Sequence, residues 1–467
     1  MRSLAITSAL AQWCQQVSWQ ALSPARRQRV VNAFIDTVGV AIAGTRDPGF
    51  ARVRSFLDRI GGWGDRGTGG RDAEVWGWGT PAGLTSAAFL NATAGHILDF
   101  DDVHYGIHGH PSTVLFPALV AVAQAERLTS ERVLVGYVAG VGVMTAVSRL
   151  YGPRHYSVGW HPTSTCGAVG AAAGVATALG APEEQIVTAI SAAVSMAAGV
   201  RANFGTLLKP LHAGFAARSG IEAAYLAASG VSAAPAALES RLGGIDVFGD
   251  GSLLHRYADP VDAALEAARR GIDELGLKLY PCCRGAHYAI DAALEVRQRL
   301  GATGADIADV WVQVPLGAKT ALIYDDPQTG LEGKFSLPYA VATALAYGVP
   351  RLGHFTDTAV QDPLTRQIMR RLVVVEDDSA GDLSGSMEGR YAIVEARTHD
   401  GRRARARVDD ARGSWTRPLT DAEVDDKFAT TAGMALPPER ARDFVRTIRG
   451  APASVELSGL FRRLHHG

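Results

Sequence analysis

The sequence is poor in lysine. Of its 46 basic residues only five are lysine, which leaves 41 arginines. The lysines are Lys209, Lys278, Lys319, Lys334 and Lys427. A compact ammonium can act where a planar guanidinium cannot. A lysine kept in this background is therefore a candidate for a specific role, with chance retention on the surface as an equal alternative.

Cysteine and net charge are also scarce. Four cysteines in 467 residues, without a Cys-x-x-Cys pair, exclude a disulfide scaffold. The His104/His108 pair has no cysteine nearby, so a structural zinc site is not expected. The net charge of -1 lacks the positive excess that nucleic-acid binding requires. The hydrophobic fraction of 47% is that of a packed globular protein rather than a disordered one.

Long hydrophobic runs are missing. The most apolar stretches, Leu134–Val147 and Cys166–Ala181, are shorter than the roughly 20 residues of a membrane-spanning helix. We expect buried helices and no membrane partner. The N-terminus lacks the continuous apolar core of a secretory signal, which together with the unpaired cysteines favours a cytoplasmic protein.

Hydrophobic periodicity predicts helices over the first half of the chain. Ser23-Pro24 has the form of an N-cap followed by proline, and apolar residues then recur at helical spacing up to Gly44. Pro182 opens a further helix that runs to Val200. Alanine and glycine are frequent from 166 to 233, which lets helices approach closely.

The pattern changes near residue 270. Residues 308–314 alternate like a strand, and 371–376 form a short strand-like apolar run bounded by charges. Segments 391–397 and 403–408 flank a hairpin signal at 399–401, and 337–347 has a helical pattern. Helical signals return at Asp421. The predicted fold is mainly α: a large all-helical domain, 1–270 completed by 412–467, and a smaller α+β domain, 271–411. Residues 61–79 are expected to form a glycine-rich loop.

Several common motifs are absent or out of context. Gly62–Gly67 matches G-x-G-x-x-G, but it follows a helical stretch without a βαβ unit, which favours a loop over a dinucleotide site. There is no P-loop. Ser112 and Ser386 lack the G-x-S-x-G context of a hydrolase nucleophile.

The densest polar cluster lies between His96 and Ser112, where three aspartates and four histidines fall within 15 residues. Such carboxylates can orient imidazoles and raise their basicity. A site for Mn, Fe or Zn is a competing interpretation, and a solvated acidic loop is a third.

Three further segments combine polar residues with helix starts or apolar surroundings. His161 and Thr163 precede a helix predicted to begin near Cys166, where free N–H groups suit a carboxylate or phosphate. Lys209 lies in an apolar stretch and needs a partner, either a bound carboxylate or an internal aspartate. Lys278 and Arg284 fall at the expected domain junction, a preferred place for ligand sites.

These segments resemble the MmgE/PrpD family. LDFDDVHYGIHGHPS, GWHPTSTCGAVGAA, GTLLKPLHAGFAARSGIEAA, KLYPCCRGAHYAID and KFSLPYAVA occur in the family's order and spacing. The resemblance covers most of the chain. It implies a helical domain with an α+β lid domain, a homodimer, and catalysis without metal or organic cofactor.

The resemblance also implies site residues, carried over motif by motif. The positions implied as catalytic are Asp99, His110, His161, Lys209, Lys278 and Tyr339. Those assigned to substrate binding are Ser112, Thr163, His212 and Arg284. The chain departs from the family pattern at Val103, where threonine is frequent, and at Cys283, where decarboxylases of the animal type have histidine.

Family members include 2-methylcitrate dehydratase, cis-aconitate decarboxylase and iminodisuccinate epimerase. All three reactions develop negative charge beside a carboxylate, which preorganised cations stabilise. We expect a metal-independent lyase acting on a small di- or tricarboxylic acid, in the first place by 2-methylcitrate dehydratase-like dehydration. A cis-aconitate-type decarboxylase, an epimerase of a substituted succinate and a non-catalytic binding protein are the alternatives.

Overall fold

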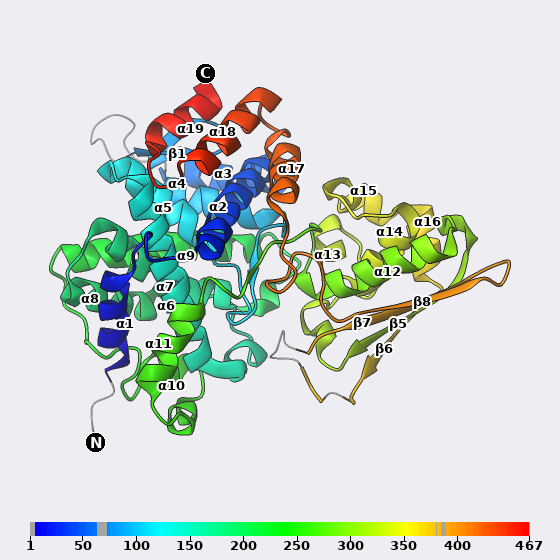
Figure 1. The fold of residues 1–467 in the computed structure, drawn as a ribbon, viewed down its shortest axis with the longest axis horizontal. Helices are drawn as coiled ribbons and strands as arrows, with labels where there is room; N and C mark the ends of the chain where they lie inside the picture. Colours follow the sequence, from blue (N-terminus) through cyan, green and yellow to red (C-terminus); the bar gives the residue numbers. More distant parts are fainter. Residues whose placement is uncertain (1–4, 63–71, 380, 384–388, 467) are drawn as a thin grey trace.

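The computed structural model describes residues 5–62, 72–379, 381–383 and 389–466. The chain forms a large helical body and a smaller α+β body beside it (Figure 1). The N-terminal part of the helical body contains α1 (Ile6–Gln16), α2 (Pro24–Gly44), α3 (Pro48–Arg59), α4 (Leu84–Ile97), α5 (Ser112–Glu126), α6 (Ser130–Ser157), α7 (Pro162–Leu179), α8 (Glu183–Met196), α9 (Leu208–Ala228), α10 (Gly244–Phe248) and α11 (Pro260–Arg270). Its C-terminal part contains α17 (Asp421–Ala432), α18 (Pro438–Gly450) and α19 (Leu457–His466). The mainly α character expected from the sequence is confirmed.

Local capping explains where several helices begin. The Ser23 side chain accepts a hydrogen bond from the Arg26 N–H at the start of α2. Thr420 and Glu423 form a capping box at the start of α17. Helix α7 begins at Pro162, four residues before the expected start near Cys166, because proline fits the first turn of a helix.

Small residues let the central helices approach closely. A Cβ atom added to Gly140 would lie 2.9 Å from the Gly170 carbonyl oxygen, and one added to Gly174 would lie 2.6 Å from the Gly136 carbonyl oxygen. Helices α6 and α7 therefore pack with their backbones nearly in contact. Their side-chain-poor faces account for the glycine and alanine enrichment of this region.

The sequence predicts that the larger body is all-helical, but this body also contains two short pairs of β-strands. Strands β1 (Asp72–Val75) and β2 (Thr80–Gly83) form an antiparallel hairpin, of which β1 lies within the predicted loop 61–79 and β2 directly follows it. Strands β3 (Val103–His104) and β4 (Leu275–Gly276) form a second short pair. Most of the G-x-G-x-x-G motif, and Ser386, lie outside the described residues.

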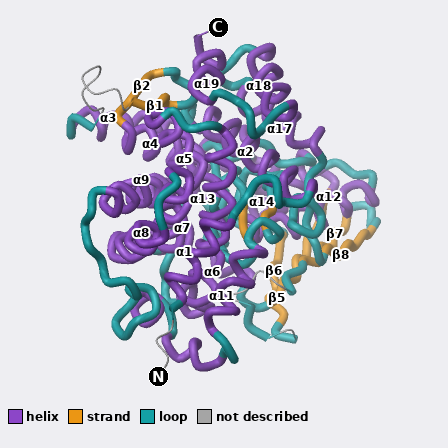
Figure 2. The backbone as a smooth tube through the Cα atoms, turned by 60° about the vertical axis from the view of Figure 1, so that its left-hand side comes forward, coloured by secondary structure: helices purple, strands orange, loops and turns teal. Residues whose placement is uncertain are grey.

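The α+β body is built on a four-stranded sheet of order β6-β5-β7-β8. Its strands are β5 (Ile307–Pro315), β6 (Leu372–Asp377), β7 (Ala392–Thr398) and β8 (Arg403–Val408), of which only the β5–β6 pair is parallel. Its helices are α12 (His287–Leu300), α13 (Gly330–Gly333), α14 (Leu337–Tyr347), α15 (Asp357–Val360) and α16 (Pro363–Met369). This sheet and the β1–β2 hairpin lie on opposite sides of the molecule (Figure 2).

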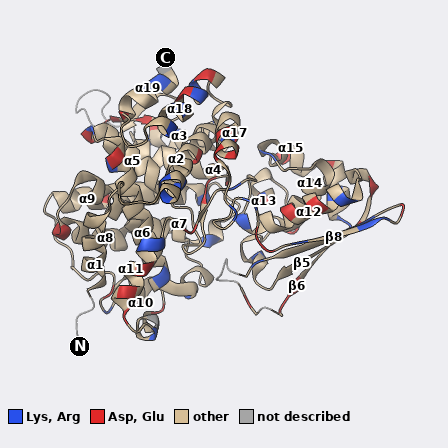
Figure 3. Ribbon diagram, viewed as in Figure 1, with Lys and Arg blue, Asp and Glu red and all other residues tan. Residues whose placement is uncertain are grey.

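Two hydrophobic clusters underlie the two bodies. The larger holds buried residues from Ile6 to Leu277 and again from Leu419 to Leu464. The smaller holds buried residues from Tyr280 to Ala411. The chain therefore passes from one cluster to the other at 277–280 and returns at 411–419. Both bodies carry intermingled acidic and basic positions (Figure 3).

Helix α6 is the one helix of the described residues long and apolar enough to cross a membrane. Its apolar window is 89% buried inside the protein. The helix also changes direction at Gly152, which has a φ of 69°. Its burial is that of a central helix of the larger core.

Candidate active site

A cavity of about 60 Å³ lies where the two bodies meet. The helical body contributes Asp99, His108, His110, Tyr156, His161, Phe204 and Lys209 to its wall. Lys278 lies on the crossing segment, and the α+β body adds Cys283, Arg284, Phe335 and Arg390. The wall therefore combines cations and imidazoles from distant parts of the sequence.

Asp99 occupies the turn that follows α4 and adopts a left-handed backbone conformation with a φ of 50°. Lys209, in the first turn of α9, forms an ion pair with its Oδ1. Lys278 donates from Nζ to Oδ2 at 2.8 Å. Burial alone would raise the pKa of the Asp99 carboxyl, but the two ammoniums hold this pKa well below its usual range. Asp99 is thus the internal aspartate that pairs with Lys209, one of the two partners expected from the sequence.

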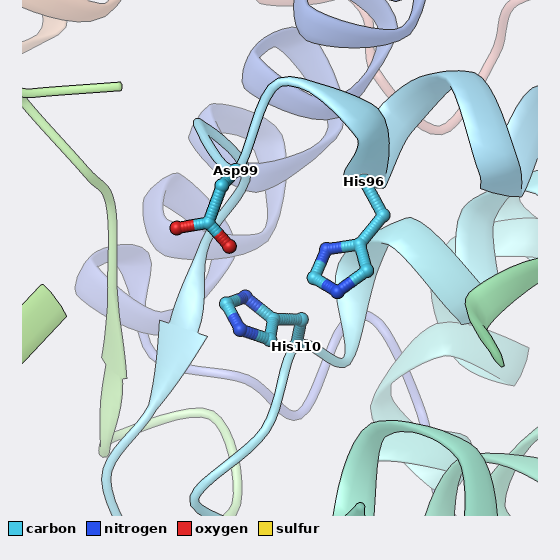
Figure 4. Close-up of side chains that lie close together, drawn as sticks. All are labelled: His96, Asp99 and His110. Atoms are coloured by element: carbon cyan, nitrogen blue, oxygen red, sulfur yellow. The ribbon is translucent and has the colours of Figure 1, made fainter. Parts of the chain in front are cut away.

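His96, Asp99 and His110 converge on a common space from the end of α4 and from the loop before α5 (Figure 4). The rings of His96 and His110 have centroids 4.5 Å apart. Asp101 lies behind both rings, with Oδ2 at 2.8 Å from Nδ1 of His96 and 3.3 Å from Nδ1 of His110. The cluster is therefore an ordered pair of imidazoles on one buried carboxylate.

The contacts of His110 define its tautomer. Nδ1 lies 2.6 Å from the Asp102 carbonyl oxygen, which can only accept, so Nδ1 carries the proton. Nε2 is then the nitrogen that can exchange a proton in the cavity. Burial lowers the pKa of His110 well below its usual range, and the Asp101 carboxylate opposes this shift. The lowered pKa favours the neutral form of the ring.

His161 and His212 form a second imidazole pair. Their Nδ1 atoms are 2.9 Å apart. Burial lowers the pKa of His161 well below its usual range, and His212 and Lys209 lower it further. His212 lies behind His161 and lines a separate cavity with Ser164 and Phe215. It reaches the main cavity through His161, whereas direct contact with substrate had been expected.

The metal interpretation can be tested on the donor atoms. His96, Asp99 and His110 offer ligand atoms within 4.8 Å of one another, and no other such cluster was found in the described part of the chain. Both Asp99 oxygens, however, already accept from ammonium groups. Two positive charges on the one carboxylate repel a divalent cation. The donor set fits an anionic ligand better than a metal ion.

Arg284 lines the cavity, and most of its N–H groups donate to other parts of the protein. Nε donates to the Tyr105 hydroxyl at 2.9 Å, and the two terminal nitrogens donate to the carbonyls of Arg412 and Ala411. The guanidinium therefore fastens the place where the chain returns to the helical body. Arg284 lies on the cavity wall, and its substrate-binding role stays a prediction.

Three other predicted residues do not reach the cavity wall. The Tyr339 hydroxyl donates to the His354 carbonyl inside the smaller core. The Ser112 hydroxyl donates to Asp102 and lies 2.6 Å from the Tyr137 hydroxyl. Thr163 accepts from the His110 backbone N–H at 3.2 Å and so supports the His110 loop. A shared motif does not fix which way each side chain points, and the roles of these three residues stay predictions.

Sequence reasoning did not select several residues that the structure brings to the site. His96 and Asp101 stood within the predicted cluster, and their spacing from Asp99 could have marked them. Phe335 and Arg390 carry no comparable signal, because their place on the wall depends on how the α+β body docks.

With this geometry in place, comparison with known proteins identifies the family. The MmgE/PrpD N-terminal domain matches residues 8–256, and the MmgE/PrpD C-terminal domain matches residues 280–449. The chain belongs to the MmgE/PrpD family, and the resemblance seen in the motifs is confirmed.

Curated relatives of this chain are cis-aconitate decarboxylases. The enzyme from Homo sapiens is 26% identical over 90% of this chain and 86% of its own length. The enzyme from Mus musculus is 25% identical over 94% of this chain and 88% of its own length. The enzyme from Aspergillus terreus is 22% identical over 98% of this chain and 96% of its own length. The family and these relatives support a lyase-type enzyme acting on a small carboxylic acid, and favour decarboxylation over the dehydration expected first.

Proposed function

We propose that this protein is a decarboxylase of cis-aconitate or a closely similar unsaturated tricarboxylate. The observation that carries the proposal is the cavity whose wall holds Lys209 and Lys278 on the Asp99 carboxylate together with the imidazoles of His110 and His161. The similarity to cis-aconitate decarboxylases along nine-tenths of the chain supports the same choice. Tyr339, the candidate donor to a departing hydroxyl in dehydration, donates its hydroxyl to the His354 carbonyl.

The cations perform the electrostatic part of the reaction. When the bond to the carboxylate on the saturated carbon breaks, CO₂ leaves and its electron pair spreads over the adjacent double bond. The charge then lies beside the two remaining carboxylates. Lys209 and Lys278, preorganised by Asp99 in a site of low dielectric, stabilise this charge as it develops.

A proton must then be added at the far carbon of the former double bond. The substrate trianion and one proton give CO₂ and the dianion of a dicarboxylic acid that carries a terminal C=CH₂ group. His110 supplies the proton from Nε2, because Nδ1 is held by the Asp102 carbonyl. A bound trianion raises the pKa of this imidazole and so loads it for donation. Acid catalysis of this kind contributes about 10²- to 10⁴-fold.

The test follows EDTA-treated protein with cis-aconitate in D₂O by proton NMR. We expect new methylene vinyl signals, release of CO₂ and one deuterium in the product. Water loss from 2-methylcitrate would instead identify a dehydratase, and deuterium uptake by iminodisuccinate without loss of mass an epimerase. Turnover that appears only after Mn²⁺ or Zn²⁺ is added would contradict the metal-independent assignment.

Two substitutions assign the activity to this cavity. Lys209→Met and His110→Gln should each lower kcat by about 100-fold or more, the range for removing a charge-stabilising group or an acid. Lys319→Met is the matched control, because Lys319 pairs with Asp325 away from the cavity wall. Equal loss in all three variants would overturn the assignment.

A further inference from the structure

Four of the five lysines gather around one turn. Besides Lys209 and Lys278, both on the cavity wall, Lys334 and Lys427 are buried nearby. Lys334 belongs to the α+β body, directly after α13, and Lys427 belongs to α17. Neither lines the cavity, so the proposed reaction leaves both without a role.

Three of the ammonium groups donate hydrogen bonds to three consecutive backbone carbonyls. Lys334 donates to the Leu98 carbonyl, Lys278 to the Asp99 carbonyl at 2.8 Å and Lys427 to the Phe100 carbonyl at 2.8 Å. Each lysine also binds a second segment. Lys334 reaches the Pro281 carbonyl at 3.2 Å, and Lys427 reaches the Lys278 carbonyl at 2.9 Å.

The position of the turn explains the need for cations. Leu98 follows the last residue of α4, where backbone carbonyls lack helical partners and the helix dipole is negative. The left-handed conformation of Asp99 costs energy that its surroundings must supply. A tetrahedral ammonium can donate in three directions within a narrow space, which a planar guanidinium cannot do. This requirement accounts for lysine in a chain that otherwise uses arginine.

We propose that Lys334 and Lys427 are positioning residues that hold the Leu98–Phe100 turn, and so keep the Asp99 carboxylate between Lys209 and Lys278. Lys334 fixes the turn from the α+β body and Lys427 fixes it from the C-terminal helices. The site is therefore complete only when all three parts of the chain are docked. This inference rests on the proposed function for its kinetic consequences, but not for its geometry.

The first test is kinetic and uses the full-length protein. Lys334→Met should lower kcat by about 10- to 100-fold with KM changed less than threefold, because misplacing a catalytic group by about 1 Å costs this much. For Lys427 the variant is Asp36→Asn/Lys427→Met, since Asp36 pairs with Lys427 at 2.6 Å and would otherwise be left unpaired. Lys319→Met is the control in the same chain and should keep kcat within twofold.

The second test is structural and does not depend on the substrate. A crystal structure of Lys334→Met should show the Asp99 carboxylate displaced from Lys278. If that variant does not fold, Lys334→Gln, which keeps an N–H donor without the charge, takes its place. A folded variant with wild-type kcat and an unmoved Asp99 would overturn the proposal. An inactive wild type would refute only the proposed function, because the position of Asp99 would still be measured.

Discussion

At the scale of single residues, Asp101 determines what the two histidines beside it can do. Its carboxylate is completely buried and accepts from His96 while facing Nδ1 of His110. Burial alone would raise the pKa of this carboxyl, but the two imidazoles bring it below its ordinary value. Asp101 is thus ionised and keeps the imidazole protons on the nitrogens that face it.

Replacing Asp101 by asparagine removes this charge at nearly constant shape. We expect kcat to fall by about 10- to 100-fold, because the carboxylate that favours the protonated form of His110 is lost. A neighbouring carboxylate raises an imidazole pKa, so its loss lowers the pKa of the donor. The basic limb of the pH–rate profile should therefore move to lower pH.

The matched control for this prediction is Asp309→Asn, which changes the same group in a surface pair with Arg397. It should leave kcat and the pH–rate profile unchanged. A basic limb that stays in place in Asp101→Asn would show that His110 is not the group that titrates.

At the scale of elements, α4 leads directly into the turn that holds Asp99 and is packed against small residues of its neighbours. Gly44 of α2 approaches the Ala94 carbonyl of α4, and Gly214 of α9 approaches Phe89 and Thr93. Gly95 of α4 itself lies against Thr113 of α5. The end of α4, and therefore Asp99, is placed by three close helix crossings.

Gly44→Ala should disturb this placement. An added Cβ would lie 1.9 Å from the Ala94 carbonyl oxygen, so α2 and α4 must separate. We expect a loss of about 1–3 kcal/mol in the free energy of unfolding, as for other overpacked cores, measured by urea titration. Gly450→Ala is the control, because a Cβ there meets nothing within 4 Å. Equal stability of the two variants would contradict this account.

How far the sequence predicts the elements follows from how local their signals are. The helix 337–347 and the strands 308–314 and 403–408 agree with α14, β5 and β8 to within one residue at each end. Caps and side-chain alternation are visible within a few residues. The β1–β2 hairpin was missed because its short strands lie among glycines, and α8 ends four residues before the expected Val200.

The candidate site shows the same limit more sharply. Motif positions found Asp99, His110, His161, Lys209 and Lys278, which do share the cavity wall. The motif could not show that the Tyr339 hydroxyl turns towards His354. Arg390 entered the wall only through tertiary contacts, which leave no trace in the local sequence.

At the scale of the whole molecule, burial of neutral histidines couples stability to pH. Burial lowers the pKa of His104 to about 4 and that of His155 to about 4. Both rings accept or share hydrogen bonds that suit the neutral form, such as the two backbone N–H groups donated to Nδ1 of His104. The unfolded chain, by contrast, protonates them near pH 6.5.

Acid should therefore destabilise the fold. Between pH 6.5 and 4 the unfolded state binds protons that the folded state excludes, so the stabilisation present above pH 6.5 is lost as the pH falls. Each such histidine contributes up to about 1.4 kcal/mol per pH unit. Urea unfolding at pH 5 and pH 7.5 measures the effect.

Substitution identifies the histidine responsible. His104→Gln should reduce this pH dependence, whereas His255→Gln, at an exposed position, should not. An unfolding free energy equal at the two pH values in the wild type would contradict the prediction.

The change of hydrophobic core between Leu277 and Tyr280 also bears on how such an enzyme diversifies. The histidines, Asp99 and Lys209 are anchored in one core, whereas Cys283, Phe335 and Arg390 belong to the stretch that follows. The cavity wall is therefore assembled from two stretches of polypeptide, with Lys278 on the segment that joins them. Substitutions at Cys283, Phe335 and Arg390 can therefore reshape this part of the wall while Lys334 still holds the Asp99 turn.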